Sequence, residues 1–290
     1  MGYTSDMPHP NLAEIKQKFP TISIRHQLID GGQKRVYAAD HSLYGTVALK
    51  LISETESERV LREIEIATKN RFKNVPEMFE TGKFTHSSGE SIYIIEQFIE
   101  GETLREYLRI NKVTSLKFAV DLLSSLLNLA VELEKSNVIH RDIKPENIIV
   151  DNSGNFWVLD FGIARMISGG KTLTSSSSHF APATPGYAPP EQYRNVRREI
   201  DIRVDLFAIG VVSYECLTGQ NPFLVGAKSP LDVFQLTETL VPKSVGVPGD
   251  KSMQLSGFIS ILMDKFPSRR PNNAVTALSW FESVIPTLEF

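Results

Sequence analysis

The first hundred residues consist mainly of short apolar runs broken by turn residues, a pattern that predicts β-strands. The expected strands are Thr21–Ile29, Arg35–Ala39, Thr46–Ile52, Met78–Phe84 and Ser91–Phe98. One polar helical segment, roughly Glu56–Asn70, follows the third run. A shorter helix-like segment, Asn11–Lys18, precedes the first run, and its sequence leaves open whether it packs on the fold or frays. This part of the chain therefore predicts five strands with one helix after the third.

The remainder of the chain is dominated by helical periodicity. Between Ser115 and Ser136, apolar residues recur at steps of three and four, which predicts one long helix packed on a core. Shorter helical pieces are expected at about Leu231–Leu240, Leu255–Lys265 and Asn273–Val284. The second half is therefore expected to be mainly α-helical.

The composition narrows the class of protein. A chain of 290 residues, 41% hydrophobic and 22% charged, can bury a sizeable core as one large domain or two modest lobes. A net charge of −3 provides no basic field, so neither nucleic acid nor a membrane is expected as a partner. The single cysteine, Cys216, lies in an apolar helical run, which predicts a buried, inert thiol. With no signal pattern and no long apolar stretch, a cytoplasmic location is expected.

Two motifs in the middle of the chain carry chemistry. The first is His-Arg-Asp-Ile-Lys-Pro-Glu-Asn at residues 140–147, and the second is Asp-Phe-Gly at residues 160–162. Asp142 and Asn147 must lie on a short loop, because Pro145 forbids a regular helix through it. Asp160 follows another apolar, strand-like run. The pattern can place one carboxylate near a substrate hydroxyl, and an amide with a second carboxylate around magnesium, as phosphoryl transfer requires.

These motifs, in this order and spacing, resemble those of eukaryotic-like (Hanks-type) Ser/Thr protein kinases in the form met in bacteria. The resemblance runs from about Ile22 to Phe281. It implies an α+β, two-lobed protein-kinase-like fold, with a small five-stranded antiparallel β lobe that holds one helix and a larger, mainly α-helical lobe. The implied divisions are an N-terminal extension at 1–20, an ATP-covering lobe at 21–98, and a catalytic and substrate-binding lobe at 99–290.

The resemblance implies a role for each polar residue of the first motif. Asp142 would orient the substrate hydroxyl, and Lys144 would neutralise charge on the γ-phosphate of ATP. Asn147 and Asp160 would hold Mg²⁺, or Mn²⁺ in its place. Thr184 would bridge Asp142 and Lys144. Lys144 also favours Ser/Thr substrates, because tyrosine kinases typically lack a lysine at this position.

The small lobe would supply the contacts to ATP. Lys50 ends the apolar strand Val-Ala-Leu-Lys and has the family's position for holding the α- and β-phosphates, a task that needs a carboxylate to orient the lysine. Glu63 has the family's position for that carboxylate, while Glu65 and Glu58 compete with it on spacing alone.

The adenine contacts would come from the segment that joins the lobes. Ile95 has the gatekeeper-like position before the hinge at residues 96–98. By resemblance, the backbones of Glu96 and Phe98 would pair with the edge of the adenine ring.

The glycine-rich loop departs from the family. Of its pattern G-x-G-x-x-G-x-V only Gly31 and Val36 remain, and together with Gly32 they are the expected nucleotide contacts. Ile29 and Lys34 replace the outer glycines. Because side chains there change how closely the backbone approaches the phosphates, loop conformation or nucleotide affinity is expected to differ. An alternative hypothesis is that Lys34 supplies a cation near the phosphates.

The segment from Asp160 to Glu191 resembles an activation segment. Its candidate phosphorylation sites are Thr172, Thr174, Ser175, Ser176, Ser177 and Ser178. Arg141 precedes the catalytic aspartate, which in the family marks kinases that dock a phosphate on this arginine, and a guanidinium fork suits that task. Autophosphorylation is therefore favoured over a merely polar loop, and self-association for phosphorylation in trans would accompany it.

Three further residues are expected to be structural. Glu191 would form a buried pair with Arg270 and so fix the substrate platform. Asp205 would orient the backbone of the catalytic loop rather than act as a second catalytic acid.

The favoured function is an ATP-dependent Ser/Thr protein kinase that acts on a protein substrate. One alternative is a pseudokinase or nucleotide-binding regulatory module, which the altered glycine-rich loop favours and the four residues Lys50, Asp142, Asn147 and Asp160 oppose. Another is a small-molecule kinase of the aminoglycoside-phosphotransferase type, against which Lys144, the Pro-Pro-Glu close at residues 189–191 and the motif around Asp205 argue.

Overall fold

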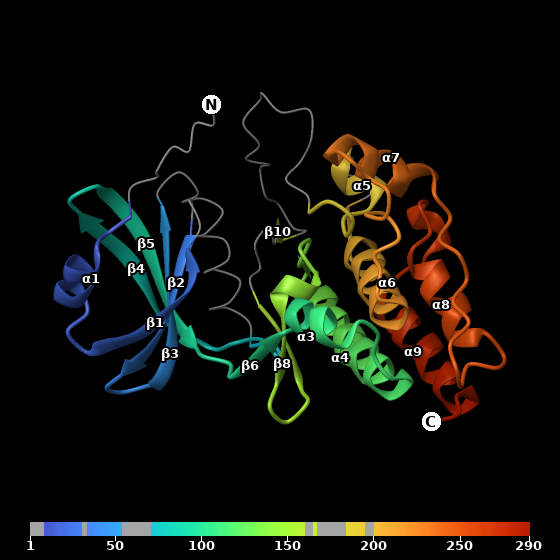
Figure 1. Cartoon of the computed structure of the whole chain (residues 1–290), viewed down its shortest axis with the longest axis horizontal. Helices are drawn as coiled ribbons and strands as arrows, with labels where there is room; N and C mark the ends of the chain where they lie inside the picture. Colours follow the sequence, from blue (N-terminus) through green and yellow to red (C-terminus); the bar gives the residue numbers. More distant parts are fainter. Residues whose placement is uncertain (1–8, 31–33, 54–70, 160–164, 167–183, 195–199) are drawn as a thin grey trace. The chain divides into compact units, whose positions relative to one another are not determined.

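The computed structural model describes residues 9–30, 34–53, 71–159, 165–166, 184–194 and 200–290. The chain divides into two compact units (Figure 1). One unit comprises Met1–Arg71 and Val75–Glu100, and the other comprises Phe72–Asn74 and Gly101–Phe290. The helix expected at Glu56–Asn70 lies outside the described residues.

The first unit is built on a five-stranded antiparallel sheet. Its strands are β1 (Ile22–Asp30), β2 (Lys34–His41), β3 (Gly45–Ser53), β4 (Met78–His86) and β5 (Gly89–Gln97). They lie in the order β1-β2-β3-β5-β4, so that β3 is central (Figure 1). All five expected strands are present, with ends that differ from the prediction by a residue or two.

Apolar side chains cover both faces of the central strands. On one face, Leu49, Leu51 and Ile95 belong to the main core of this unit. On the other face, Ile52 and Ile94 form a smaller cluster with neighbouring residues of β4 and β5. Successive residues of a strand point to opposite faces, so this division separates odd from even positions on β3. Lys50 therefore lies on the face of the smaller cluster.

The helix α1 (Leu12–Lys18) packs on the main core rather than fraying. Asn11 and Glu14 form a reciprocal cap, in which each side chain accepts a hydrogen bond from the backbone N–H of the other residue. The second carboxylate oxygen of Glu14 accepts from the backbone N–H of Ser87 at 2.7 Å. Ile15 and Phe19 are buried in the main core. The question that the sequence left open is settled in favour of packing.

The second unit is mainly helical. Its helices are α3 (Leu104–Asn111), α4 (Leu116–Lys135), α5 (Pro190–Tyr193), α6 (Arg203–Thr218), α7 (Pro230–Thr239), α8 (Gln254–Leu262) and α9 (Ala274–Val284), with short 3-10 turns at Pro145–Asn147, Pro267–Arg269 and Ile285–Thr287. Helix α4 packs against α6 and α9, and α6 packs against α8 (Figure 1). Helix α6 is buried around most of its circumference, so it forms the centre of this unit. The sheet and the helices together confirm the α+β fold.

Two small sheets hold the loop that carries the first motif. Strands β6 (Gly101–Thr103), β8 (Ile148–Asp151) and β9 (Phe156–Val158) form one sheet, and β7 (Val138–Ile139) pairs with β10 (Arg165–Met166) in the other. Residues 140–147 run from the end of β7 to the start of β8. The loop is therefore anchored at both ends by strand pairing.

Helix α3 is an element that the hydrophobic pattern did not predict. It is short, and only Leu104 and Leu108 are buried in it. Its start is marked by a capping box, in which Thr103 accepts from the backbone N–H of Glu106 and Glu106 accepts from that of Thr103.

The remaining expectations for this unit concern Cys216 and membrane spans. Cys216 lies fully buried in α6, as predicted, and burial raises the pKa of its thiol. Within the part of the chain that the structure describes, no helix is long and apolar enough to cross a membrane.

Candidate active site

The side chains of the first motif converge on the carboxylate of Asp142. Asn147 donates its amide N–H to Asp142 Oδ2 at 2.9 Å and to the Asp142 carbonyl at 3.0 Å. Lys144 Nζ lies 2.9 Å from Asp142 Oδ2. Thr184 donates its hydroxyl to Asp142 Oδ1 at 2.5 Å and accepts from Lys144 Nζ at 3.1 Å. The structure thus brings a carboxylate, an ammonium, an amide and a hydroxyl into one cluster.

This cluster leaves one of the two expected metal ligands, Asn147, with an oxygen that could bind a metal ion. Because the amide nitrogen of Asn147 is committed to Asp142, the amide oxygen is the atom of Asn147 suited to a hard cation. The second expected ligand, Asp160, lies outside the described residues. Among the residues that are described, no group of three or more His, Cys, Asp or Glu side chains could hold a metal ion by itself.

Backbone hydrogen bonds join the catalytic loop to the strand end before the second motif. The N–H of Leu159 donates to the carbonyl of Asn147 at 2.8 Å. His140 is fully buried, and its Nε2 lies 3.2 Å from the Leu159 carbonyl. His140 Nδ1 accepts from the N–H of Asp142 at 3.3 Å, so Nε2 is the nitrogen that carries the proton. Since Leu159 directly precedes Asp160, the chain enters the second motif from a fixed position beside Asn147.

Asp205, in the first turn of α6, fixes the backbone of the catalytic loop. Its Oδ2 accepts from the N–H of His140 and its Oδ1 from the N–H of Arg141, both at 2.8 Å. Asp205 is fully buried, and burial raises the pKa of its carboxyl. Arg141 has a φ of 66°, a left-handed conformation that residues other than glycine rarely adopt. The bonds to Asp205 hold this strained residue beside Asp142.

Glu191 and Arg270 form a buried ion pair within the second unit. The guanidinium nitrogens lie 2.5 and 3.1 Å from the two carboxylate oxygens, and both side chains are almost fully excluded from solvent. Arg270 also donates to the carbonyls of Asp264 at 2.7 Å and Arg203 at 3.0 Å. Its guanidinium lies over the ring of Phe207, 4.9 Å from the centroid. The pair connects α5 with the segment before α9, as the resemblance implied.

Lys50 forms a second buried ion pair, within the sheet of the first unit. It lies on β3 between Val36 on β2 and Ile94 on β5. Its Nζ is 2.6 Å from Oε1 of Glu96, which lies on β5 and shares its face of the sheet. The sequence predicted a carboxylate partner for Lys50 on the following helix, and Glu63 lies outside the described residues. The described partner comes from the neighbouring strand.

The side chains of Ile95, just before the expected hinge, and of Glu96, its first residue, lie where the sequence did not place them. Ile95 was expected as the gatekeeper, but its side chain belongs to the main core on the face opposite Lys50. Strand side chains alternate between faces, so this side chain lies away from Lys50, and the gatekeeper role of Ile95 stays a prediction. Glu96 was expected to act through its backbone, yet its side chain takes the place beside Lys50. Phe98 follows the end of β5.

A comparison with protein families decides the identity. A family model described as the protein kinase domain matches residues 24–281. The chain belongs to the protein kinase family. This confirms the family predicted from the sequence, and membership implies the use of ATP and a divalent metal ion.

Several curated relatives of this chain come from bacteria. They include a probable serine/threonine-protein kinase PknB of Bifidobacterium longum, 30% identical over 85% of this chain and 36% of the relative. The serine/threonine-protein kinase PknB of Mycobacterium leprae is 28% identical over 88% of this chain and 42% of its own length. The serine/threonine-protein kinase PrkC of Bacillus subtilis is 32% identical over 70% of this chain and 32% of its own length. The chain therefore spans less than half of the length of each of these relatives.

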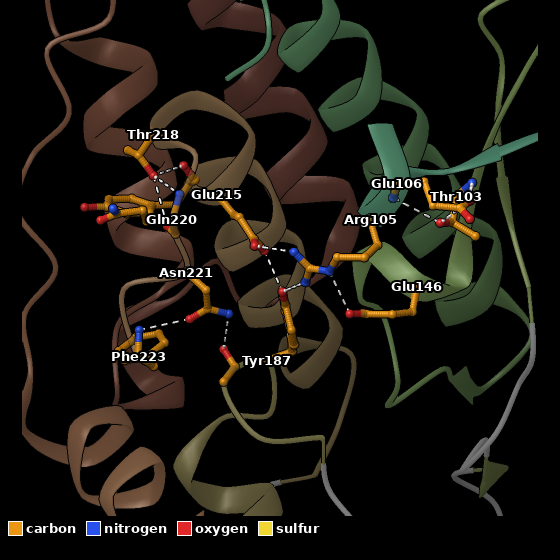
Figure 2. A network of polar contacts seen from close by, with 12 residues as sticks. Thr103, Arg105, Glu106, Glu146, Tyr187, Glu215, Thr218, Gln220, Asn221 and Phe223 are labelled. Carbon is orange, nitrogen blue, oxygen red and sulfur yellow. Dashed lines mark hydrogen bonds and ion pairs between the residues drawn. The ribbon is translucent and has the colours of Figure 1, made fainter. Parts of the chain in front are cut away.

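A polar network that sequence reasoning missed ties the catalytic loop to three other segments, one of which is α3 (Figure 2). Arg105 on α3 contacts Glu146 at 2.7 Å and Glu215 at 2.6 Å, and it also donates to the hydroxyl of Tyr187. Tyr187 in turn donates to Glu215 at 2.5 Å. Burial, reinforced by the carboxylate of Glu215, raises the pKa of Tyr187. The network joins the catalytic loop, α6 and the segment that begins at Thr184.

Several expected site residues belong to the part of the chain that the structure does not describe. Those that lie outside the described residues are Gly31, Gly32, Glu63, Asp160, Thr172, Thr174, Ser175, Ser176, Ser177 and Ser178. Their roles in phosphate covering, lysine orientation, metal binding and autophosphorylation stay predictions.

Proposed function

We propose that the chain transfers the γ-phosphate of ATP to serine and threonine hydroxyls of a protein substrate. The observation that carries this proposal is the cluster of Lys144, Asn147 and Thr184 around the carboxylate of Asp142. A carboxylate held from three sides is pre-organised to receive a substrate hydroxyl, which is most of what a protein contributes to phosphoryl transfer.

Each residue of the cluster has a task in this reaction. Asp142 accepts the hydroxyl proton while the bond from the hydroxyl oxygen to phosphorus forms and the bond from phosphorus to the leaving ADP oxygen breaks. Lys144 offsets negative charge on the group in transfer, and Thr184 keeps Lys144 and Asp142 together. Asn147 keeps the carboxylate turned toward the substrate side by donating to it. Asp205 acts indirectly, because it holds the backbone N–H groups of the catalytic loop and so positions Asp142.

The metal site is proposed on Asn147 and Asp160. The amide oxygen of Asn147 fits an oxygen-liganded ion, which favours Mg²⁺ and admits Mn²⁺. When bound, such an ion neutralises charge on the phosphates of ATP.

The test uses the wild type and the Asp142→Asn variant with ATP, Mg²⁺ and a generic protein acceptor. We expect Asp142→Asn to lower the transfer rate at least ~100-fold, the range typical of a positioned acid-base group. The matched control is Asp121→Asn, which changes a solvent-accessible aspartate on α4 and should transfer at the wild-type rate. Phosphate is located by mass spectrometry. Equal activity in wild type and Asp142→Asn would refute the assignment of Asp142.

The activity is proposed to be controlled by autophosphorylation of residues 172–178. Arg141 supports this proposal, because its backbone is held next to Asp142 by Asp205, and a docked phosphate would act on the same loop. The same mass spectrometry locates the sites, and replacing all six hydroxyl residues by alanine should lower activity. A rate of self-phosphorylation that rises with chain concentration would support self-association in trans. A rate constant independent of concentration would support transfer within one chain.

A second candidate is a nucleotide-binding regulatory module without transfer activity. The altered glycine-rich loop favours it, since Ile29 is about half exposed at the end of β1 where the family has a glycine. Retained ATP binding with no phosphate on the chain or on any acceptor would select this candidate over the enzyme.

A further inference from the structure

Lys50 and Glu96 lie diagonally across two neighbouring strands on one face of the sheet. Lys50 is opposite Ile94 in the register of β3 and β5, and Glu96 is opposite Ala48 two positions away. Diagonal neighbours on one face of a sheet lie within reach of long side chains. The register therefore predicts contact, and the observed separation of Lys50 Nζ from Glu96 Oε1 is 2.6 Å.

The surroundings of this pair are apolar and closed to solvent. Lys50 is 4% exposed and Glu96 7% exposed. Val36, Ala48 and Ile94, which flank them on the same face, are all buried. An ammonium and a carboxylate taken out of water are stable only when paired, because each loses its hydration. The contact between Lys50 and Glu96 therefore stabilises both charges in this location.

The contact with Glu96 restricts the position of the Lys50 ammonium, which a phosphate-binding lysine requires. Lysine carries its charge on a flexible four-carbon stem, so fixing the ammonium in one place has an entropic cost. A carboxylate on a neighbouring strand of the same sheet is a rigid anchor for it. An ammonium has three donors, so the contact with Glu96 is compatible with a simultaneous bond to a phosphate oxygen.

We propose that Glu96 is a positioning residue, which holds the ammonium of Lys50 in place for the phosphates of ATP. This role rests on the proposed use of ATP, and it assigns to the sheet itself a task that the sequence analysis gave to a carboxylate of the following helical segment. The proposal does not depend on where Glu63 lies, because Lys50 and Glu96 meet within one sheet.

The test measures dissociation constants for ATP and for adenosine, with Asp142→Asn present throughout so that no ATP is consumed. Glu96→Gln keeps the shape of the side chain and removes its charge. We expect it to weaken ATP binding roughly 3- to 30-fold, the range of coupling between residues in contact. Adenosine binding should not change, because adenosine has no phosphate. Glu96→Asp, which keeps the charge on a shorter side chain, should recover part of the loss.

A Lys50→Met background separates positioning from damage to the fold. If Glu96 acts through Lys50, then Glu96→Gln has no further effect on ATP affinity once Lys50 is absent. Equal losses for ATP and adenosine, an equal loss in the Lys50→Met background, or a gain in ATP affinity would each overturn the proposal. The gain would identify Glu96 as a competitor of the phosphates.

Failure of this inference can be told apart from failure of the proposed function. A chain that binds ATP with the expected coupling but transfers no phosphate would retain the role of Glu96 and lose the kinase activity. If the chain transfers phosphate but Glu96→Gln leaves the affinity for ATP unchanged, the kinase activity is retained and the role of Glu96 is lost. The rate at which a small amine-reactive reagent labels lysine side chains gives a second measurement, made without nucleotide. Glu96→Gln should speed labelling of Lys50 and leave the solvent-exposed Lys83 unchanged.

Discussion

Two buried ion pairs in the described part of the chain are alike in burial and different in chemistry. In the second unit, Arg270 meets Glu191 with two contacts and gives two further donors to backbone carbonyls. In the first unit, Lys50 meets one oxygen of Glu96 at 2.6 Å, among apolar residues of a sheet. A planar guanidinium is suited to such a fixed, many-sided arrangement, whereas an ammonium is a compact charge that can take a further ligand. The difference teaches that burial alone does not make a pair structural.

The largest effect is expected from breaking the pair in the second unit. Glu191→Gln leaves the guanidinium of Arg270 buried without its countercharge, so the free energy of unfolding should fall by about 3–5 kcal/mol. Urea denaturation followed by circular dichroism measures this. Asp121→Asn on the surface of α4 serves as the control and should stay within about 0.5 kcal/mol of wild type. A loss below about 1 kcal/mol for Glu191→Gln would remove the contrast between the pairs.

An intermediate loss of stability is expected when the polar network around Arg105 is broken, because the guanidinium of Arg105 is partly exposed. Tyr187→Phe removes a hydroxyl that accepts from Arg105 and donates to Glu215, so stability should fall by about 1.5–3 kcal/mol. Tyr107→Phe is a matched control, because the ring of Tyr107 stacks on Phe118 at 4.6 Å and is kept in the variant. Equal midpoints of thermal unfolding for the two variants would show that the network adds nothing to stability.

The smallest loss of stability is expected when both members of the pair in the sheet become apolar. The double variant Lys50→Met with Glu96→Met should be as stable as wild type or more stable by up to about 4 kcal/mol, because desolvation of two charges is avoided. Its ATP-dependent transfer should be lost. The matching double variant, Glu191→Met with Arg270→Met, should stay destabilised, because the carbonyls of Asp264 and Arg203 lose their donor. Similar unfolding curves for the two double variants would contradict this distinction.

Much of the fold could be predicted because its elements have clear periods. Long or regular apolar patterns mark the five strands and the helices α4, α7, α8 and α9. The structure has these elements where the patterns predict them. Helix α3 was not predicted, because only two of its residues are buried. The spacing of Thr103 and Glu106 nevertheless has the form of a capping box. Short polar helices are better found from their caps than from periodicity.

The candidate site could be predicted where a motif is local and not where it depends on register. Asp142, Lys144 and Asn147 lie within six consecutive positions, and their cluster follows from the loop that holds them. Glu96 could not be assigned, because its contact with Lys50 depends on how β3 and β5 align, and a shift of one residue exchanges the two faces. The network of Arg105, Tyr187 and Glu215 joins segments far apart in the sequence, and no spacing rule encodes it.

The helix α1 has a practical consequence for how this protein is handled in the laboratory. A shortened chain that starts at the first strand, as the family pattern alone suggests, would lack Ile15 and Phe19. The apolar face formed by Leu49, Leu51 and Ile95 would then lose part of its cover and become a site for unwanted association between copies. Expression trials should therefore keep Asn11 and the turn of helix that it caps.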